Sequence, residues 1–156
     1  MIEINIPGYR TLKLEHIVFD YNGTLAVDGE VIPGVKELLR SLAEHLIVHI
    51  LTADTFGKVK SRLSDLPCNI TILPENEQDI GKRNFVQSLG ANRTVAVGNG
   101  RNDRLMLQSS VLGIAVILGE GASAQTLAMA DVVCTSIIEA LALLENPLRL
   151  VATLRS

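Results

Sequence analysis

The chain has 156 residues and a formal net charge of −3; 47% of its residues are apolar, 3% are aromatic and none is Trp. This length fits one domain, residues 1–156, with a core of Val, Ile, Leu and Ala, and the acidic balance excludes the basic footprint of a nucleic-acid-binding protein. No apolar run reaches the roughly 18 residues of a membrane span, and the first residues lack the layout of a signal peptide. We therefore expect a cytoplasmic protein that has neither nucleic acid nor membrane as a partner and whose two cysteines stay reduced.

The first 32 residues predict two β-hairpins on either side of one buried strand. Polar and apolar residues alternate in the first hairpin, an apolar run closed by aspartate is typical of a buried parallel strand, and an Asp-Gly pair turns the second hairpin. These elements span residues 2–14, 17–20 and 24–32. The next helix is expected to begin at Pro33, because the fixed φ of proline suits the first helical position.

From residue 47 onward, strands alternate with helices. The expected strands cover 47–51, 69–73, 94–97, 113–118 and 132–134, and the expected helices cover 55–63, 77–89, 102–109, 123–129, 137–144 and the tail from 147. Such an alternation predicts a mostly parallel sheet with helices on both faces. The expected fold class is α/β: a Rossmann-like three-layer α/β/α domain with a mostly parallel sheet and an N-terminal β-hairpin.

Polar side chains follow three of these strands. Asp20-Tyr21-Asn22 ends the first, Thr52-Ala53-Asp54 follows the second, and Asn99 to Asp103 follow the third. Open α/β sheets bind ligands at the carboxyl ends of their strands, so these side chains converge if the strands are neighbours. Lys82, near the start of the helix before the third strand, adds an ammonium group. A carboxylate, a hydroxyl, an ammonium and a second acidic cluster together suit phosphoryl transfer with Mg²⁺.

Each residue also has an ordinary structural interpretation. Asn22-Gly23 fits an Asx-turn, Thr52 fits a helix N-cap, and Asn99-Gly100 fits a plain turn. Lys82 fits a solvated surface lysine, and Asp103 fits a charge at the start of a helix. We interpret Asp54 as a cap or a surface charge. The three histidines are interpreted as isolated residues without a role: His16, His45 and His49.

The order of the motifs adds specificity, because it resembles the haloacid dehalogenase superfamily of aspartate-nucleophile phosphotransferases. Within it the resemblance is closest to the phosphorylation domain of P-type ATPases and small soluble proteins like it, over about residues 15–145. The family patterns Asp-x-(Asp/Thr)-Gly-Thr-(Leu/Val), an apolar strand ending in Thr or Ser, a lysine before the fourth strand, and Gly-Asp-Gly-x-Asn-Asp are matched in order. The matching residues are Asp20-Tyr21-Asn22-Gly23-Thr24-Leu25, Ile50-Leu51-Thr52, Lys82 and Gly98-Asn99-Gly100-Arg101-Asn102-Asp103.

The resemblance implies a role for each matched residue. Asp20 would be the nucleophile that becomes an aspartyl-phosphate, and Asn22, Thr52 and Lys82 would complete the catalytic set. Mg²⁺ would be the cofactor, held by Asp20, the backbone carbonyl of Asn22, Asn99 and Asp103. The phosphorylated substrate would meet Gly23, Thr24, Thr52, Ala53, Lys82 and Asn102.

Two departures from the family pattern affect the expected activity. Asn22 replaces the aspartate that serves many of these phosphatases as general acid and base, a function typically worth about 10²–10⁴-fold. The site should therefore favour leaving groups that need little protonation, such as acyl phosphates or a nucleotide diphosphate. Asn99 replaces an acidic metal ligand, so one negative charge is missing and metal affinity should fall.

The gaps between the motifs leave no room for the cap domain that many superfamily members insert. Capless members tend to act on large substrates or to shield the site by oligomerising, so we expect a homo-oligomer. Its candidate contact elements are the N-terminal hairpin and the hairpin at Asp28-Gly29.

Three other hypotheses compete with a phosphohydrolase. A non-catalytic relative that binds a phosphorylated ligand or a partner protein is consistent with Asn22 and Asn99. Four retained residues argue against complete decay: Asp20, Thr52, Lys82 and Asp103. A phosphorelay receiver domain would carry its aspartate on the third strand, which is the wrong order here. A Rossmann-type nucleotide binder would need a G-x-G-x-x-G motif after the first strand, and the sequence has none there.

Overall fold

The computed structural model describes residues 1–54 and 57–156, and its centre is a parallel β-sheet. The strands lie in the order β10-β9-β8-β3-β6-β7, and every adjacent pair is parallel. Their bounds are β3 (His16–Asp20), β6 (Ile47–Thr52), β7 (Cys68–Ile72), β8 (Thr94–Gly98), β9 (Leu112–Val116) and β10 (Val132–Cys134). The predicted α/β fold class with a parallel sheet is thereby confirmed.

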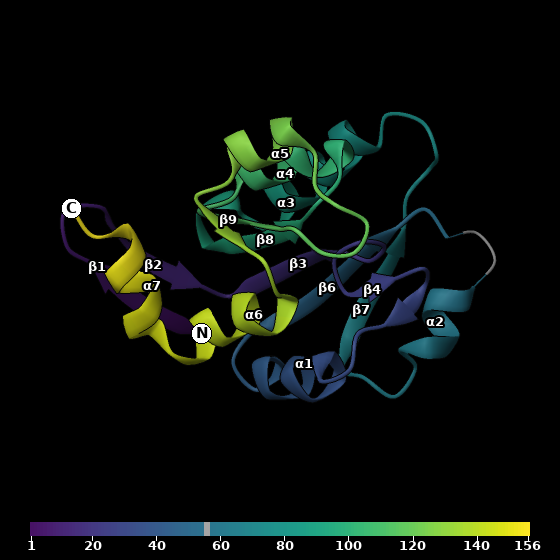
Figure 1. Cartoon of the computed structure of the whole chain (residues 1–156), viewed down its shortest axis with the longest axis horizontal. Helices are drawn as coiled ribbons and strands as arrows, with labels where there is room; N and C mark the ends of the chain where they lie inside the picture. Colours follow the sequence, from purple (N-terminus) through teal and green to yellow (C-terminus); the bar gives the residue numbers. More distant parts are fainter. Residues whose placement is uncertain (55–56) are drawn as a thin grey trace.

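The strands carry apolar side chains on both faces, and helices cover both faces of the sheet (Figure 1). In β3, Ile17 and Phe19 belong to one core cluster, whereas Val18 between them belongs to the other. This alternation follows from the period of two in a strand, and the burial of both faces explains the continuous apolar run in the sequence. The first cluster lies under α1 (Val35–Ala43) and α6 (Ile137–Glu145), and the second under α3 (Gln78–Leu89), α4 (Arg104–Ser109) and α5 (Ala124–Met129).

Both predicted hairpins are present. Strands β1 (Ile2–Ile6) and β2 (Arg10–Leu14) are antiparallel, bury the apolar side chains of one face, and lie with helix α7 (Pro147–Leu154) at one end of the molecule (Figure 1). Strands β4 (Ala26–Val27) and β5 (Glu30–Val31) form the second hairpin. Its turn residues Asp28 and Gly29 both have positive φ, at 51° and 79°, as a tight turn of the primed type requires.

Helices α1, α3, α4 and α5 begin one or two residues later than the sequence predicts. Helix α1 begins at Val35 and not at Pro33, because Gly34 between them adopts a left-handed φ of 89° that no α-helix continues. Helix α2 (Lys58–Arg62) lies inside the predicted range 55–63, whose residues 55–56 lie outside the described part of the chain. Helix α3 ends at Leu89 before Gly90, as predicted.

The connections between the strands are short. The segment from β3 to β6 holds only the β4–β5 hairpin and α1, and the described residues from β6 to β8 hold only α2, β7, α3 and a single 3₁₀ turn. Neither segment forms a cap domain within the described residues. None of the helices in residues 1–54 and 57–156 has the length and apolar character needed to span a bilayer.

Candidate active site

The three strands that end in polar residues are neighbours in the sheet. Strand β3 lies between β6 and β8, so Asp20, Thr52 and the segment after Gly98 meet at the same edge. Phe19 is in register with Ile50 and with Val97, which brings the three strand ends to one level. The convergence that the sequence predicts is therefore present.

Lys82 lies between two carboxylates at the centre of this edge. Its Nζ is 2.7 Å from Oδ1 of Asp20 and 2.6 Å from Oδ1 of Asp103. The side chains of Lys82 and Asp103 are 2% and 0% exposed, and that of Asp20 is 14% exposed. Lys82 reaches this position from α3, where it lies one turn before the buried Val86 on the face toward the sheet. The surface-lysine interpretation of Lys82 is wrong.

The surroundings raise the pKa values of both Asp20 and Lys82. Burial raises the pKa of Asp20, the charge of Asp103 raises it further, and Lys82 offsets only part of this, which leaves it at about 7. Burial works against the charged form of Lys82, but the carboxylates of Asp103 and Asp20 outweigh it and raise its pKa. One ammonium group thus serves two carboxylates, and the ionised triad carries an excess negative charge.

Asp103 is held in place by the backbone of the turn before it. Its Oδ2 accepts hydrogen bonds from the backbone N–H groups of Asn99 and Gly100, each at 2.9 Å. A Cβ at Gly98 would lie 2.5 Å from Cγ of Asp103, so only glycine allows this carboxylate to approach the strand end. The carboxylate therefore orders the turn and meets Lys82 at the same time.

Asn99 connects three loops through its side-chain amide. Its Oδ1 accepts a hydrogen bond from the Thr24 hydroxyl at 3.2 Å, and its Nδ2 donates to the Gly121 carbonyl at 3.0 Å. A carboxylate at position 99 would lose the second bond, because it has no N–H to donate. Gly23 has a φ of +78°, and a Cβ there would lie 2.3 Å from Asn99, so these two residues are packed against each other. These contacts explain why an amide fits at position 99, where the superfamily pattern has an acid.

The loop after Asp20 is a compact turn. The Tyr21 carbonyl accepts hydrogen bonds from the N–H groups of Thr24, Leu25 and Ala26, and Gly23 donates its N–H to Ala26. The N–H groups of Gly23 and Thr24 are therefore used within the loop. Asn22, at its tip, is exposed to solvent.

The remaining predicted residues surround this centre. The hydroxyl of buried Thr52 accepts a hydrogen bond from the Asp54 N–H at 3.1 Å, and Oδ2 of Asp54 accepts one from the Val59 N–H at 2.8 Å. The Asp54 carboxylate thereby accepts a backbone N–H of the first turn of α2, whose N-cap residue is Gly57, in agreement with the cap interpretation. Asn102 is half-buried, and its Nδ2 donates a hydrogen bond to Oε1 of Gln78, the first residue of α3, at 2.7 Å.

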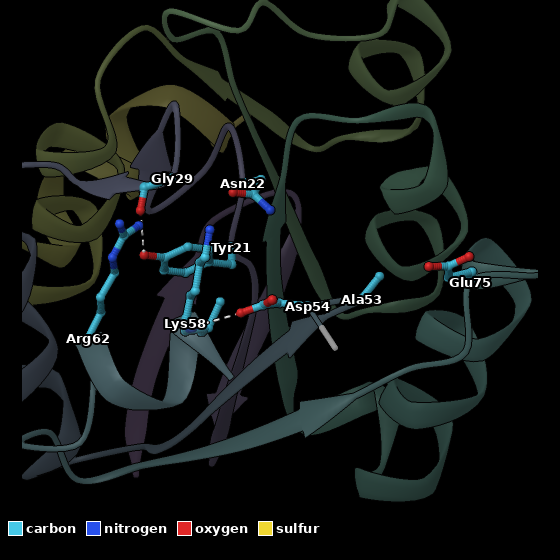
Figure 2. A pocket seen from close by; sticks show the side chains of 9 residues that line it. Tyr21, Asn22, Gly29, Ala53, Asp54, Lys58, Arg62 and Glu75 are labelled. Atoms are coloured by element: carbon cyan, nitrogen blue, oxygen red, sulfur yellow. Dashed lines mark hydrogen bonds between the residues drawn. The ribbon is translucent and has the colours of Figure 1, made fainter. Parts of the chain in front are cut away.

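A cavity of about 320 Å³ lies beside this centre (Figure 2). Its described walls come from the loop after Asp20, the β4–β5 turn, the segment after Thr52, α2, and the segment between β7 and α3. These residues are Tyr21, Asn22, Gly29, Ala53, Asp54, Lys58, Val59, Arg62 and Glu75. Sequence reasoning missed Lys58 and Arg62, which are four residues apart and so lie on one face of a helix; that spacing is the signal that was available.

The donor chemistry of the site fits a magnesium ion. Mg²⁺ in proteins is bound by one or two carboxylates and otherwise by oxygens of substrate and water, and Asp20 and Asp103 supply two carboxylates. The excess negative charge of the triad also favours a cation. Among the described residues no cluster of three or more His, Cys, Asp or Glu side chains could hold a metal ion.

Two of the histidines are paired, contrary to the sequence interpretation. Nδ1 of His16 lies 3.1 Å from Nε2 of His49, across the neighbouring strands β3 and β6, and His49 also packs edge-on against Phe85. Burial lowers the pKa of His49 to about 4, with a further contribution from His16. The sequence shows no periodic relation between the two positions, because only the parallel pairing of the strands brings them together.

No protein-family model matches the chain. The uncharacterised protein MJ0073 of Methanocaldococcus jannaschii is 48% identical over 63 residues, which cover 40% of this chain and 68% of MJ0073.

Two solved structures show the fold. The cobalt-bound deoxy-D-mannose-octulosonate 8-phosphate phosphatase of Haemophilus influenzae has a TM-score of 0.71 at 14% identity, over 86% of this chain and 88% of that chain. The catalytic domain of the CPx-ATPase CopB-B has a TM-score of 0.59 at 25% identity, over 75% of this chain and 46% of that chain. The chain therefore belongs to the same family as MJ0073, and it has the fold of the haloacid dehalogenase superfamily of phosphohydrolases without a cap domain.

Proposed function

We propose that this protein is a Mg²⁺-dependent phosphohydrolase or phosphotransferase that acts through an aspartyl-phosphate on Asp20. The observation that carries the proposal is the buried Lys82 ammonium between the carboxylates of Asp20 and Asp103. An ion triad at the carboxyl edge of a parallel sheet costs desolvation energy, and burying charge in this way is typical of functional sites.

In the proposed reaction, a carboxylate oxygen of Asp20 forms a bond to phosphorus. The bond from phosphorus to the leaving oxygen breaks, and its electron pair stays on that oxygen. Lys82 neutralises charge on the phosphoryl oxygens, and the Thr52 hydroxyl donates a hydrogen bond to one of them. Water then attacks the phosphorus of the aspartyl-phosphate, which releases inorganic phosphate and a proton and restores Asp20. The carboxylates of Asp20 and Asp103, the Asn22 carbonyl and the Asn99 amide oxygen would hold Mg²⁺, whose charge would stabilise the transferred phosphoryl group.

Asn22 determines which leaving groups this site can expel. Its amide cannot protonate the leaving oxygen or deprotonate the attacking water. We therefore expect acyl phosphates and other leaving groups of low basicity to be substrates, and alkyl phosphates to be poor ones. The aspartyl-phosphate should accumulate, because its hydrolysis also lacks general-base help.

The test is to trap the intermediate. Wild-type protein and Asp20→Ala are mixed with Mg²⁺ and ³²P-labelled acetyl phosphate and quenched in acid. Acid-stable label that is released by hydroxylamine and is absent from Asp20→Ala supports the proposal. Equal label in Asp20→Ala, or no label together with no Mg²⁺-dependent phosphate release, contradicts it.

A catalytically impaired protein that binds a phosphorylated ligand or regulates a partner is the second candidate. It is favoured by the two amides, Asn22 and Asn99, at positions where the superfamily pattern has carboxylates. The variant Asn22→Asp separates the two candidates, since it restores an acid at an exposed position without disturbing the Asn99 bonds. A rise in turnover indicates an enzyme that lacks only its proton shuttle, whereas no gain favours the binding protein.

A further inference from the structure

Most of the residues that line the cavity of about 320 Å³ beside the triad have no role in the proposed reaction. Tyr21 and Asn22 follow Asp20 directly, and Ala53 follows Thr52 directly, so the cavity begins where the phosphoryl site ends. It is the adjoining space in which the group attached to the phosphate can lie. Its volume is at the lower end of the range for small-molecule pockets.

Hydrogen bonds join the two sides of this cavity. The Tyr21 hydroxyl donates to the Gly29 carbonyl at 3.1 Å, and Arg62 of α2 forms a 2.7 Å ion pair with Glu30 of β5. A Cβ at Gly29 would lie 3.1 Å from Nη1 of Arg62, so the β4–β5 turn and α2 are packed closely here. The cavity is therefore a formed site whose shape is held by specific contacts.

The positive and negative side chains of the cavity are turned in different directions. Lys58 extends from α2 toward Asn22 in Figure 2, and it makes no ion pair with any residue in the described part of the chain. The Asp54 carboxylate accepts a hydrogen bond from the Val59 N–H at the start of α2, and Glu75 lies at the opposite side of the view. The part of the cavity next to Asn22 is therefore its cationic part.

We propose that this cavity binds the leaving group of the substrate, and that Lys58 recognises a second anionic group on that leaving group. The substrate class is then a small phosphorylated acid. The inference rests on the proposed function, because the cavity receives a leaving group only if Asp20 accepts the phosphoryl group. It adds to that function a basis for substrate choice that neither Asp20 nor Lys82 provides.

The test uses two aryl phosphates of similar size that differ by one charge: 4-carboxyphenyl phosphate and its methyl ester. We expect the wild type to prefer the carboxylate by about tenfold or more in kcat/KM, since hydrogen bonds to charged groups have about that effect on binding. Lys58→Met should remove this preference, so that kcat/KM for the carboxylate falls to about the value for the methyl ester. Lys60→Met is the matched control, because Lys60 is exposed on the same helix but does not line the cavity.

Binding of both compounds to the wild type and to Lys58→Met is measured in parallel by calorimetry. Turnover of both compounds without a charge preference, or a preference that survives in Lys58→Met, overturns the proposed anion site and leaves the phosphohydrolase function intact. Lys58-dependent preference in binding without any turnover supports the site and contradicts the phosphohydrolase function. Equal binding of both compounds without turnover overturns both proposals.

Discussion

Replacing the proposed nucleophile should make the folded protein more stable. Asp20 is mostly buried, faces the charge of Asp103, and shares one lysine with it. Its pKa of about 7, against 3.8 for an ordinary aspartate, means that its ionised form is unfavourable in the fold. At about 1.36 kcal/mol per pKa unit this corresponds to on the order of 4 kcal/mol. Asp20→Asn removes the charge but keeps an oxygen that can accept the hydrogen bond from Lys82.

The stability that Asp20→Asn gains over the wild type should depend on pH. Between the unfolded pKa of 3.8 and the folded pKa of about 7, the folded state binds the extra proton, so the wild type loses stability as the pH rises through this window. Asp20→Asn should therefore match the wild type near pH 4 and exceed it by about 2–4 kcal/mol at pH 8, in EDTA. The comparison is made at each pH because His49 titrates in an overlapping window with the opposite sign.

Urea unfolding followed by circular dichroism measures this difference. Asp79→Asn is the control, since the Ile80 N–H and Arg104 lower the pKa of Asp79 and its neutralisation should bring no gain. A difference between Asp20→Asn and wild type that does not change with pH, or a loss of stability at pH 8, would refute the reasoning. Mg²⁺ should reduce the advantage of the variant, because a bound cation favours the ionised carboxylate.

Three further predictions concern the packing around the site. His49→Leu should gain up to about 3 kcal/mol of stability relative to the wild type as the pH falls from 6.5 toward 4, because the unfolded wild-type histidine binds a proton that the folded one excludes; a difference between variant and wild type that does not change with pH in urea unfolding would count against the buried pair. Gly98→Ala should lower the free energy of unfolding by about 1–3 kcal/mol and remove most of the activity, since its Cβ would lie 2.5 Å from Asp103. The control Gly81→Ala should be neutral or stabilising, because the nearest neighbour of its Cβ would lie at 3.8 Å. Equal thermal unfolding of the two variants would contradict this prediction. Asn99→Asp should lower stability by about 1–3 kcal/mol in EDTA through the lost bond to the Gly121 carbonyl, and a variant as stable as wild type would show that this bond contributes little.

The sequence predicts most of the fold because its signals are local. The apolar run at Ile17 to Phe19, the Asp28-Gly29 turn and the strand–helix alternation each reflect a short-range preference, and the parallel sheet follows from their order. The start of α1 was misplaced because the preference of Pro33 for a first helical position was overridden by the left-handed Gly34. Such overrides depend on how the chain packs, which local patterns do not contain.

Some residues of the candidate site could likewise be predicted from the sequence, and others could not. The residues that carry the motifs, Asp20, Lys82 and Asp103, could be selected from their order along the chain, and the sheet topology then brings them together. The function of the Asn99 amide as a link to Gly121 could not be predicted, because it depends on a contact between loops 22 residues apart. Lys58 and Arg62 have the spacing of one helix face, but this spacing alone does not show that a cavity lies beside that face.

The central claim is that Asp20 accepts a phosphoryl group, and the most direct measurement locates the modified residue. Protein incubated with Mg²⁺ and acetyl phosphate is reduced with borohydride, which converts an aspartyl-phosphate to homoserine, and is then digested and sequenced by mass spectrometry. We expect homoserine at position 20 in the wild type. We expect none there in Lys82→Met, because this variant lacks the ammonium group that neutralises the phosphoryl oxygens of the substrate. Homoserine at Asp54 or Asp103 instead, or none anywhere in protein that hydrolyses acetyl phosphate, would contradict it.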